Sequence, residues 1–264
     1  MDSLTFVGNA TTVLRLGEFT LLTDPNFLRR GQRAYLGRGL WTRRLTDPAL
    51  TPDQLPPLDA VVLSHLHGDH WDRVATRELD RSPPVLTTTA AAPRLARHGF
   101  DTVGLDTWAE STLERGQERL RVVALPGVHA RGLMRRLLPP VMGSLLEHSV
   151  AGQVRRRVYV SGDTLDGSHL DAVRDRFPAI DVAIMHLGGT RVLARTVTMD
   201  ATQGVDFLRR ISPVAAVPVH FDDYPVFKSP LADFLVGTRA ASLTTELRTV
   251  QRGATVSLEA STHD

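Results

Sequence analysis

The chain has 264 residues, of which 42% are hydrophobic and 23% are charged, as in ordinary globular proteins. This composition excludes a disordered or collagen-like chain, and we expect one domain over residues 1–264. No apolar run is long enough for a membrane-spanning helix, and the N-terminal residues lack the pattern of a secretory signal. A cytoplasmic location is therefore expected.

The basic residues are almost all arginines, because Lys228 is the only lysine, and the formal net charge is only +2. The arginines are scattered and are not interleaved with aromatic residues, so no nucleic-acid partner is expected. Cysteine is absent, which excludes disulfides, thiolate nucleophiles and Cys-ligated metals. Any metal must therefore be bound through nitrogen and oxygen atoms.

Hydrophobic periodicity predicts an antiparallel meander at the N-terminus, then a long irregular loop over residues 27–57, then alternating strands and helices. Strands are predicted at residues 4–6, 13–16, 19–22, 59–64, 85–88, 119–125, 156–160, 181–185 and 215–219. Helices are predicted at residues 71–79, 90–98, 200–211 and 230–240. This order is typical of sheets that pack together with helices outside.

Four potential metal ligands, His65, His67, Asp69 and His70, lie within six positions directly after the apolar strand at 59–64. Such a concentration is improbable by chance, so an ordinary solvated loop is disfavoured. His65 and His67 are two residues apart in an extended turn and can point at one ion. Asp69 and His70, near the start of the next helix, can point at a second ion.

Four ligands cannot complete two metal sites, so others must come from elsewhere. His129, Asp163 and His220 each follow a predicted strand, where a rigid sheet can position them. Two divalent ions held in this way would share a bridging hydroxide, oriented by Asp69, that attacks a carbonyl or phosphoryl group. Zinc suits nitrogen and oxygen ligands, and Mn²⁺ or Fe²⁺ would also be tolerated.

On these residues the chain resembles the metallo-β-lactamase fold superfamily, whose HxHxDH motif reads here as His65, His67, Asp69 and His70. The resemblance covers nearly the whole chain and is closest to the bacterial branch with L-ascorbate-6-phosphate lactonase and N-acylphosphatidylethanolamine phospholipase D. It implies an α/β fold, a four-layer αββα sandwich with the site along one edge of the sheets. It also implies the following ligands: His65, His67 and His129 for one ion, Asp69, His70 and His220 for the other, and Asp163 bridging both.

Four other residues are candidates for supporting or substrate-binding roles. Asp24 ends the third predicted strand, and the resemblance places it behind the ligands, where it would accept an N–H from a ligating histidine; a turn cap is the alternative. Asn9 stands where relatives commonly have histidine. His186 could contact substrate or protonate a leaving group, or could be a structural histidine at a strand end. Tyr224 follows His220 closely enough to line a pocket.

The segment between His129 and Glu147 combines arginines with apolar residues and is expected to be a loop beside the site. Arg131, Arg135 and Arg136 could pair with the phosphate or carboxylate of an amphipathic substrate. The alternative is a helix packed on the core or a contact between subunits.

The sequence therefore predicts a dinuclear metal-dependent hydrolase that cleaves an ester-type bond, either a phosphodiester or a lactone, in a small or amphipathic anionic substrate. The expected partner is a small-molecule or lipid-like substrate, and a homo-oligomer is compatible with the sequence. One alternative is a di-iron oxidoreductase, disfavoured because no flavodoxin-like extension follows and the motif keeps His67. Another is a catalytically degenerate metal-binding module, disfavoured because all seven ligand positions are intact.

Overall fold

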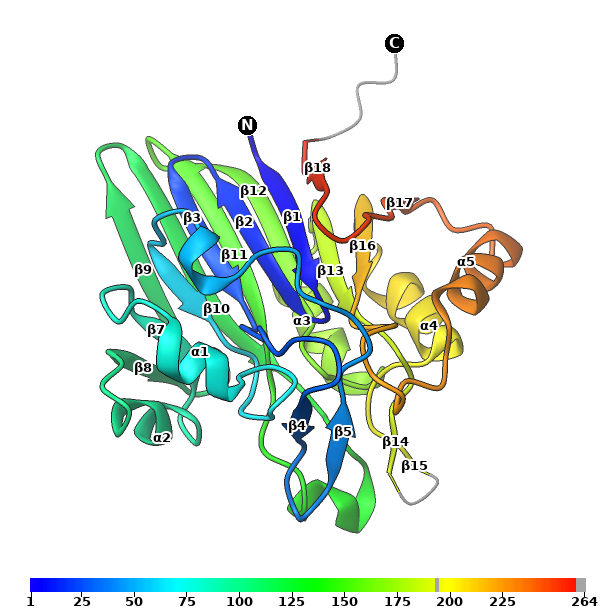
Figure 1. The fold of residues 1–264 in the computed structure, drawn as a ribbon. Coiled ribbons are helices and arrows are strands. Elements are labelled where there is room, and N and C mark those ends of the chain that lie inside the picture. The colour runs from blue at the N-terminus through cyan, green and yellow to red at the C-terminus, as the bar shows by residue number, and fades with distance from the viewer. Residues whose placement is uncertain (193–194, 260–264) are drawn as a thin grey trace.

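Two seven-stranded sheets pack face to face and carry helices on their outer faces (Figure 1). The structure is a computed structural model that describes residues 1–192 and 195–259. The arrangement is the predicted four-layer αββα sandwich, so the predicted fold class is confirmed. Within the described residues, none of the helices combines the length and the hydrophobicity needed to cross a lipid bilayer.

The first sheet has the strand order β18-β1-β2-β3-β6-β7-β8. Its strands are β1 (Ser3–Gly8), β2 (Thr11–Leu16), β3 (Phe19–Thr23), β6 (Ala60–Val62), β7 (Val85–Thr88), β8 (Thr102–Leu105) and β18 (Thr255–Ser257). β1, β2 and β3 form the predicted antiparallel meander, and β3, β6, β7 and β8 run parallel. Two short helices, α1 (Arg73–Glu78) and α2 (Ala92–Ala96), accompany this sheet.

The second sheet has the strand order β17-β16-β13-β12-β11-β10-β9. Its strands are β9 (Glu110–Arg115), β10 (Glu118–Pro126), β11 (Met142–Val150), β12 (Gln153–Val160), β13 (Val182–His186), β16 (Ala215–Val219) and β17 (Glu246–Leu247). β9 to β12 are antiparallel, and β12, β13, β16 and β17 are parallel. Its helices are α3 (Asp171–Arg176), α4 (Ala201–Ile211) and α5 (Leu231–Ala240).

Short elements in the connections complete the described chain. They are the hairpins β4 (Arg33–Tyr35) with β5 (Trp41–Arg43) and β14 (Arg191–Val192) with β15 (Arg195–Thr196), and the 3-10 turns η1 (Pro52–Gln54), η2 (Gly132–Arg136) and η3 (Ser168–Leu170). Figure 1 shows β4 and β5 at the lower end of the molecule, below the two sheets.

Side-chain alternation along the strands builds the core in layers. In β6, Val62 faces the central layer between the sheets and Val61 faces the layer beneath α1 and α2. In β10, Val122 faces the central layer, whereas Val123 packs in the layer with α3, α4 and α5. Each fully buried side chain of this size contributes about 1.5–3 kcal/mol. Both sheets are thus stabilised on both faces, and their edges can carry polar loops.

Two segments expected to be loops contain regular structure. Residues 27–57 include the β4–β5 hairpin, and residues 131–147 include η2 and the start of β11 at Met142. The polar residues Ser144, Glu147 and His148 interrupt the apolar pattern of β11, although all three are buried. Strand β9 was not predicted because it lies at the edge of its sheet, where its residues are half-buried or exposed and give no apolar signal.

Candidate metal centre

The predicted ligands meet where several strands end at one edge of the sandwich. β3 and β6 are parallel neighbours, and the segment after β6 carries the HxHxDH motif. Strands β10, β12, β13 and β16 also share one direction. His129 follows β10, Asp163 follows β12, His186 is the last residue of β13, and His220 follows β16. Because parallel strands bring their carboxyl ends to one edge, residues distant in sequence become neighbours.

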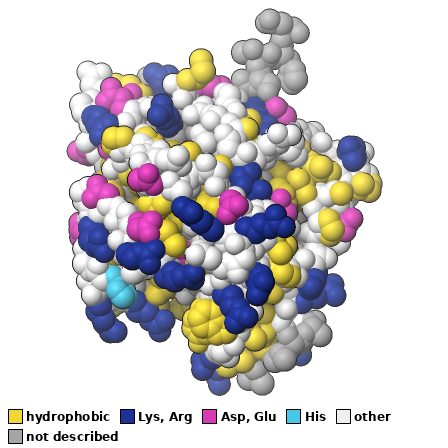
Figure 2. All heavy atoms as spheres, viewed as in Figure 1, with side chains coloured by type: hydrophobic (Ala, Val, Ile, Leu, Met, Phe, Trp, Pro, Cys, Tyr) yellow, Lys and Arg dark blue, Asp and Glu magenta, His cyan; other side chains and the backbone are white. Residues whose placement is uncertain are grey.

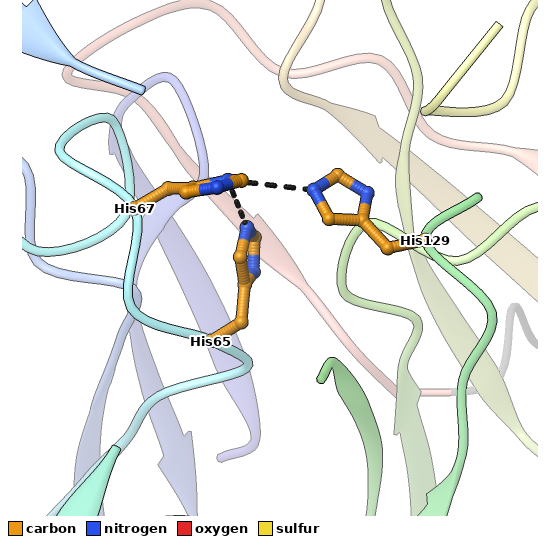
Figure 3. Close-up of side chains that lie close together, drawn as sticks. All are labelled: His65, His67 and His129. Carbon is orange, nitrogen blue, oxygen red and sulfur yellow. Dashed lines mark hydrogen bonds between the residues drawn. The ribbon is translucent and has the colours of Figure 1, made fainter. Parts of the chain in front are cut away.

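The first group of ligands consists of His65, His67 and His129, whose rings point toward one another (Figure 3). His65 Nε2 lies 2.9 Å from His67 Nδ1, and His129 Nε2 lies 3.4 Å from the same atom. Ligand atoms 2.0–2.1 Å from a tetrahedral ion lie about 3.3 Å from one another. The three nitrogens are therefore spaced as ligands of one small cation.

The second group consists of Asp69, His70 and His220. Asp69 Oδ2 lies 3.4 Å from His220 Nε2 and 3.8 Å from His70 Nε2. Asp163 lies between the two groups: its Oδ2 is 3.2 Å from His70 Nε2 and 4.0 Å from His65 Nε2. The structure thus brings together all seven residues that the sequence singled out as ligands.

Several polar atoms of this cluster are buried without a partner. Asp69 Oδ1, Asp163 Oδ1 and His70 Nε2 have no hydrogen bond within the described residues. Buried polar atoms are nearly always satisfied, so each such atom calls for an explanation. Cations held by nitrogen and oxygen atoms, together with the water that such ions carry, would satisfy them, and the residues present therefore fit the group that the resemblance implies.

Polar contacts on the far side of the rings decide which nitrogen faces the cluster. His129 Nδ1 donates to the carbonyl of Val197 at 2.8 Å, and His220 Nδ1 donates to the carbonyl of Leu187 at 3.1 Å. His70 Nδ1 lies 3.3 Å from Asp24 Oδ2. In each ring Nε2 is left to face the ligands, which is how outer partners orient histidines in metal sites.

The cluster is already close to the protonation states that metal binding needs. Burial, together with neighbouring histidines, holds the pKa of His65 well below its usual value and lowers the pKa of His67 to about 3. Burial opposes ionisation of Asp163, but His220 and His70 outweigh it and hold its pKa well below the usual value. These histidines are neutral and this carboxylate is charged at neutral pH.

His70 differs because it is surrounded by carboxylates. Burial opposes its protonation, but Asp163, Asp69 and Asp24 outweigh this and hold the pKa of His70 well above the ordinary value. A cation that replaced its proton would satisfy the same carboxylates. Metal binding at this position is therefore expected to release a proton.

Asp24 and His186 lie behind the ligands and not at a substrate-accessible surface. Asp24 is fully buried, accepts from the backbone N–H of Ser64 at 2.8 Å and lies 3.1 Å from His186 Nε2. His186 is also fully buried, and its Nδ1 lies 3.3 Å from Ser161 Oγ. The interpretation of His186 as a substrate-contacting acid is thus corrected: the side chain is fully buried against Asp24, as expected for the alternative of a structural histidine at a strand end.

Asn9 joins the two sides of the second ligand group. Its Nδ2 donates to the backbone carbonyl of Asp69 at 2.5 Å, and the backbone carbonyl of Asn9 accepts from the backbone N–H of His220 at 2.9 Å. Asn9 and His220 both have left-handed backbone conformations, with φ of 55° and 63°. Such conformations are costly in non-glycine residues and persist where the surroundings impose them. Asn9 is therefore a positioning residue for both ligands.

A buried ion pair supports Asn9 from below. Asp223 Oδ2 accepts from the backbone N–H of Asn9 at 2.7 Å, and Asp223 Oδ1 pairs with Arg44 Nη2 at 3.0 Å. Arg44 Nη1 also donates to the carbonyl of Asn26 at 2.7 Å. Sequence reasoning assigned no role at the site to Arg44, Asn26 or Asp223. The closeness of Asp223 to His220 in sequence was the one available signal.

The predicted substrate-binding residues fall into different places. Tyr224 is buried and donates to Asn26 Oδ1 at 2.9 Å, so its prediction as a pocket-lining residue is wrong. Arg131 donates to the carbonyl of Asp166 at 2.6 Å. A groove lies beside the cluster and is lined in part by His67, Tyr35 and Trp41, but Arg131 is not among its lining residues. Arg135 is exposed and also lies outside that lining, whereas Arg136 is part of it.

The family described as Beta-lactamase superfamily domain matches residues 20–221, which include all seven ligand candidates. The chain belongs to the beta-lactamase superfamily. Among superfamily relatives, a UPF0173 metal-dependent hydrolase of Nanoarchaeum equitans is 22% identical over 192 residues, covering 73% of this chain and 82% of its own.

Two solved structures share the fold of this chain. A possible metal-dependent hydrolase from Veillonella parvula has a TM-score of 0.81 and 24% identity, over 97% of this chain and 99% of its own. An isothiocyanate hydrolase from Delia radicum gut bacteria also has a TM-score of 0.81, with 20% identity, over 97% and 98% of the two chains. At these identities the likeness concerns the fold.

Proposed function

We propose that this chain is a dinuclear metal-dependent hydrolase that cleaves an ester-type bond, a phosphodiester or a lactone, in a small or lipid-like anionic substrate. One observation carries the proposal: two ligand groups meet at one edge of the fold with Asp163 between them and with buried polar atoms unpaired. His65, His67 and His129 would hold one ion, and Asp69, His70 and His220 the other. The relatives named as metal-dependent hydrolases support the metal-dependent hydrolase part of the proposal.

The protein's own residues supply binding and orientation. Divalent ions, when bound, would activate water and polarise the electrophile. Asp69 is ionised, since His70 and His220 outweigh the effect of burial and lower its pKa. Its Oδ1 has no hydrogen-bond partner among the described residues, so it can accept a hydrogen bond from the attacking water and aim it.

Substrate would approach from the side of His67. That ring is half-buried and lines the groove beside the cluster, whereas His65, His70 and His220 are fully buried. Three finer proposals rest on the sequence resemblance and pattern alone. They are a relation to the L-ascorbate-6-phosphate lactonase and phospholipase D branch, zinc rather than Mn²⁺ or Fe²⁺, and a cytoplasmic location.

The test combines elemental mass spectrometry with turnover before and after chelation. The substrates are bis(p-nitrophenyl) phosphate, an acyl lactone and allyl isothiocyanate, the last because one structural neighbour is an isothiocyanate hydrolase. We expect about two equivalents of metal and chelator-sensitive cleavage of one substrate, lost in H67A and retained in H98A, a histidine variant outside the cluster.

Other results would point elsewhere. No bound metal after reconstitution, together with no turnover, would favour the degenerate metal-binding module. Bound iron with oxygen consumption and no hydrolysis would favour the di-iron oxidoreductase.

A further inference from the structure

A groove of about 810 Å³ opens beside the metal cluster, and His67 forms part of its wall. The other walls come from the β4–β5 hairpin, the first residue of α1, Arg94 of α2 and the residues that follow η2. His67 Nδ1 faces His65 and His129, so one ring takes part in both the cluster and the groove. A molecule in the groove would therefore lie next to any ion that the cluster holds.

The hairpin is attached directly to the HxHxDH motif. The backbone N–H of Gly68 donates to the carbonyl of Tyr35 at 2.9 Å. A Cβ atom at position 68 would lie only 2.6 Å from that oxygen, so any side chain there would push the hairpin away. The absence of a side chain at Gly68 thus lets the hairpin, and with it the groove, lie directly beside the cluster. This explains why glycine occupies a position of the motif that is not a metal ligand.

Five arginines from four segments line this groove: Arg33, Arg38, Arg73, Arg94 and Arg136. Among the described residues none of the five forms an ion pair with a carboxylate. Elsewhere arginines such as Arg210 and Arg157 are paired with acids at 2.6–2.9 Å. The positive charge of the groove is therefore uncompensated.

The one acidic residue in the described lining, Asp72, does not neutralise this charge. Its carboxylate accepts from the backbone N–H groups of Leu28 at 2.6 Å and Ala75 at 2.8 Å. Asp72 is also buried, and its Oδ2 accepts further hydrogen bonds from the backbone N–H of Phe27 and from Asn26 Nδ2. An anionic ligand would meet arginines without competition from this side chain.

The groove also has an apolar part. The rings of Tyr35 and Trp41 lie 4.8 Å apart and are 45% and 59% exposed, and Leu137 is 44% exposed. Figure 2 shows hydrophobic side chains bordered by basic ones at the lower end of the molecule, where Figure 1 places β4 and β5. Large exposed aromatic side chains beside a groove are typical of a surface that contacts a ligand.

We infer that this groove binds the substrate through an anionic group carried on an apolar or planar body, with the arginines holding the charge and Tyr35 and Trp41 packing on the body. The inference rests on the proposed function, since it takes the bound molecule to be the one cleaved at the cluster. Guanidinium groups bind phosphate and carboxylate through paired hydrogen bonds. The substrate-binding arginines inferred here are therefore those of the β4–β5 hairpin, α1 and α2, together with Arg136, and not Arg131 and Arg135.

The test is a calorimetric titration of the purified protein, before and after chelation, with octyl phosphate, octanoate, ADP and inorganic phosphate. The R94Q/R136Q variant removes two groove arginines whose side chains make no hydrogen bond among the described residues. R155Q/R239Q removes the same charge from exposed positions outside the groove. A W41A variant removes one of the two aromatic rings and no charge.

We expect R94Q/R136Q to weaken octyl phosphate or ADP binding about tenfold, and R155Q/R239Q to weaken it less than twofold. W41A should weaken organic ligands while leaving inorganic phosphate unchanged. Preference for ADP would indicate a planar body, preference for octyl phosphate an alkyl chain, and a comparable affinity for octanoate a carboxylate head.

Equal effects of the two double variants, or no binding of any organic anion, would overturn the inference. The titration does not depend on turnover. Loss of groove binding with chelator-sensitive hydrolysis intact would refute the groove alone. Groove binding in a protein without bound metal or hydrolysis would refute the proposed function and leave the groove as a binding site for an anion that is not cleaved.

Discussion

Arg44 and Asp223 form a completely buried ion pair, with 3.0 Å between Nη2 and Oδ1, that is linked to the metal ligands through Asn9. A buried charge is costly unless it is paired and hydrogen-bonded. Asp223 meets this condition through Arg44, Arg252, Thr46 and the backbone of Asn9. The pair is therefore a support on which the geometry of the second ligand group depends.

Replacing Asp223 by Asn should destabilise the chain by about 3–5 kcal/mol, because the Arg44 charge would remain buried without its partner. Urea unfolding of the metal-free protein measures this. D206N is the matched control, since Asp206 pairs with Arg209 on the exposed surface of α4, where such pairs contribute about 1 kcal/mol or less. Similar losses in both variants would contradict the supporting role of the buried pair.

Replacing Asn9 by Gly should lower metal affinity about tenfold, as loss of an outer partner commonly does. Glycine accepts the left-handed backbone at this position, so the change removes the amide that holds Asp69 without imposing backbone strain. Competition with a chromophoric chelator measures the affinity. A151G controls for added backbone freedom at another left-handed position, and equal affinities in the two variants would refute the prediction.

Replacing Asp69 by Asn should reduce turnover at least about a hundredfold, the scale of losing one aligned polar group in a catalytic site. The amide retains the shape of the side chain but cannot act as a charged acceptor for water. Turnover is followed with the substrate identified in the chelation experiment, and circular dichroism checks the fold. A rate like that of the original protein would rule out the orienting role.

Stability should fall as pH rises through about 6 because of Asp222. Burial and the neighbouring Asp223 raise the pKa of Asp222 from 3.8 to about 6. Between these values the folded chain holds a proton that the unfolded chain has released, so this group's stabilising contribution is present at low pH and is lost with rising pH. Urea midpoints from pH 4.5 to 7.5 should show a shallower decline for D222N than for the original chain. Parallel curves would contradict the assignment to Asp222.

Much of the fold follows from local sequence pattern. The run from Ala60 to Leu63 alternates between two apolar layers, and the antiparallel meander could be predicted from spacing alone. Edge strands such as β9 could not, since half-exposed residues carry little apolar signal. The β4–β5 hairpin is small and arginine-rich, and its place is decided by its contact with Gly68 rather than by its own sequence.

Some residues of the candidate site could likewise be predicted from the sequence, and others could not. Seven potential ligands could be selected because histidine and aspartate at strand ends are conspicuous, and the structure places them together. The depth of His186 and Tyr224 was not predictable, because burial depends on which elements cover a residue. Arg44 resembles the other arginines in sequence, and only its position beneath Asn26 and Asp223 distinguishes it.

The ligands come from segments far apart in the chain, and Asp69 and His220 are 151 positions from each other. An ion held between them would act as a cross-link that closes a very long loop, in a protein that has no cysteine to form a covalent one. Loading the metal should thus fasten the first sheet to the second at their shared edge. The two halves would then separate, on heating or during proteolysis, only after the ion had left.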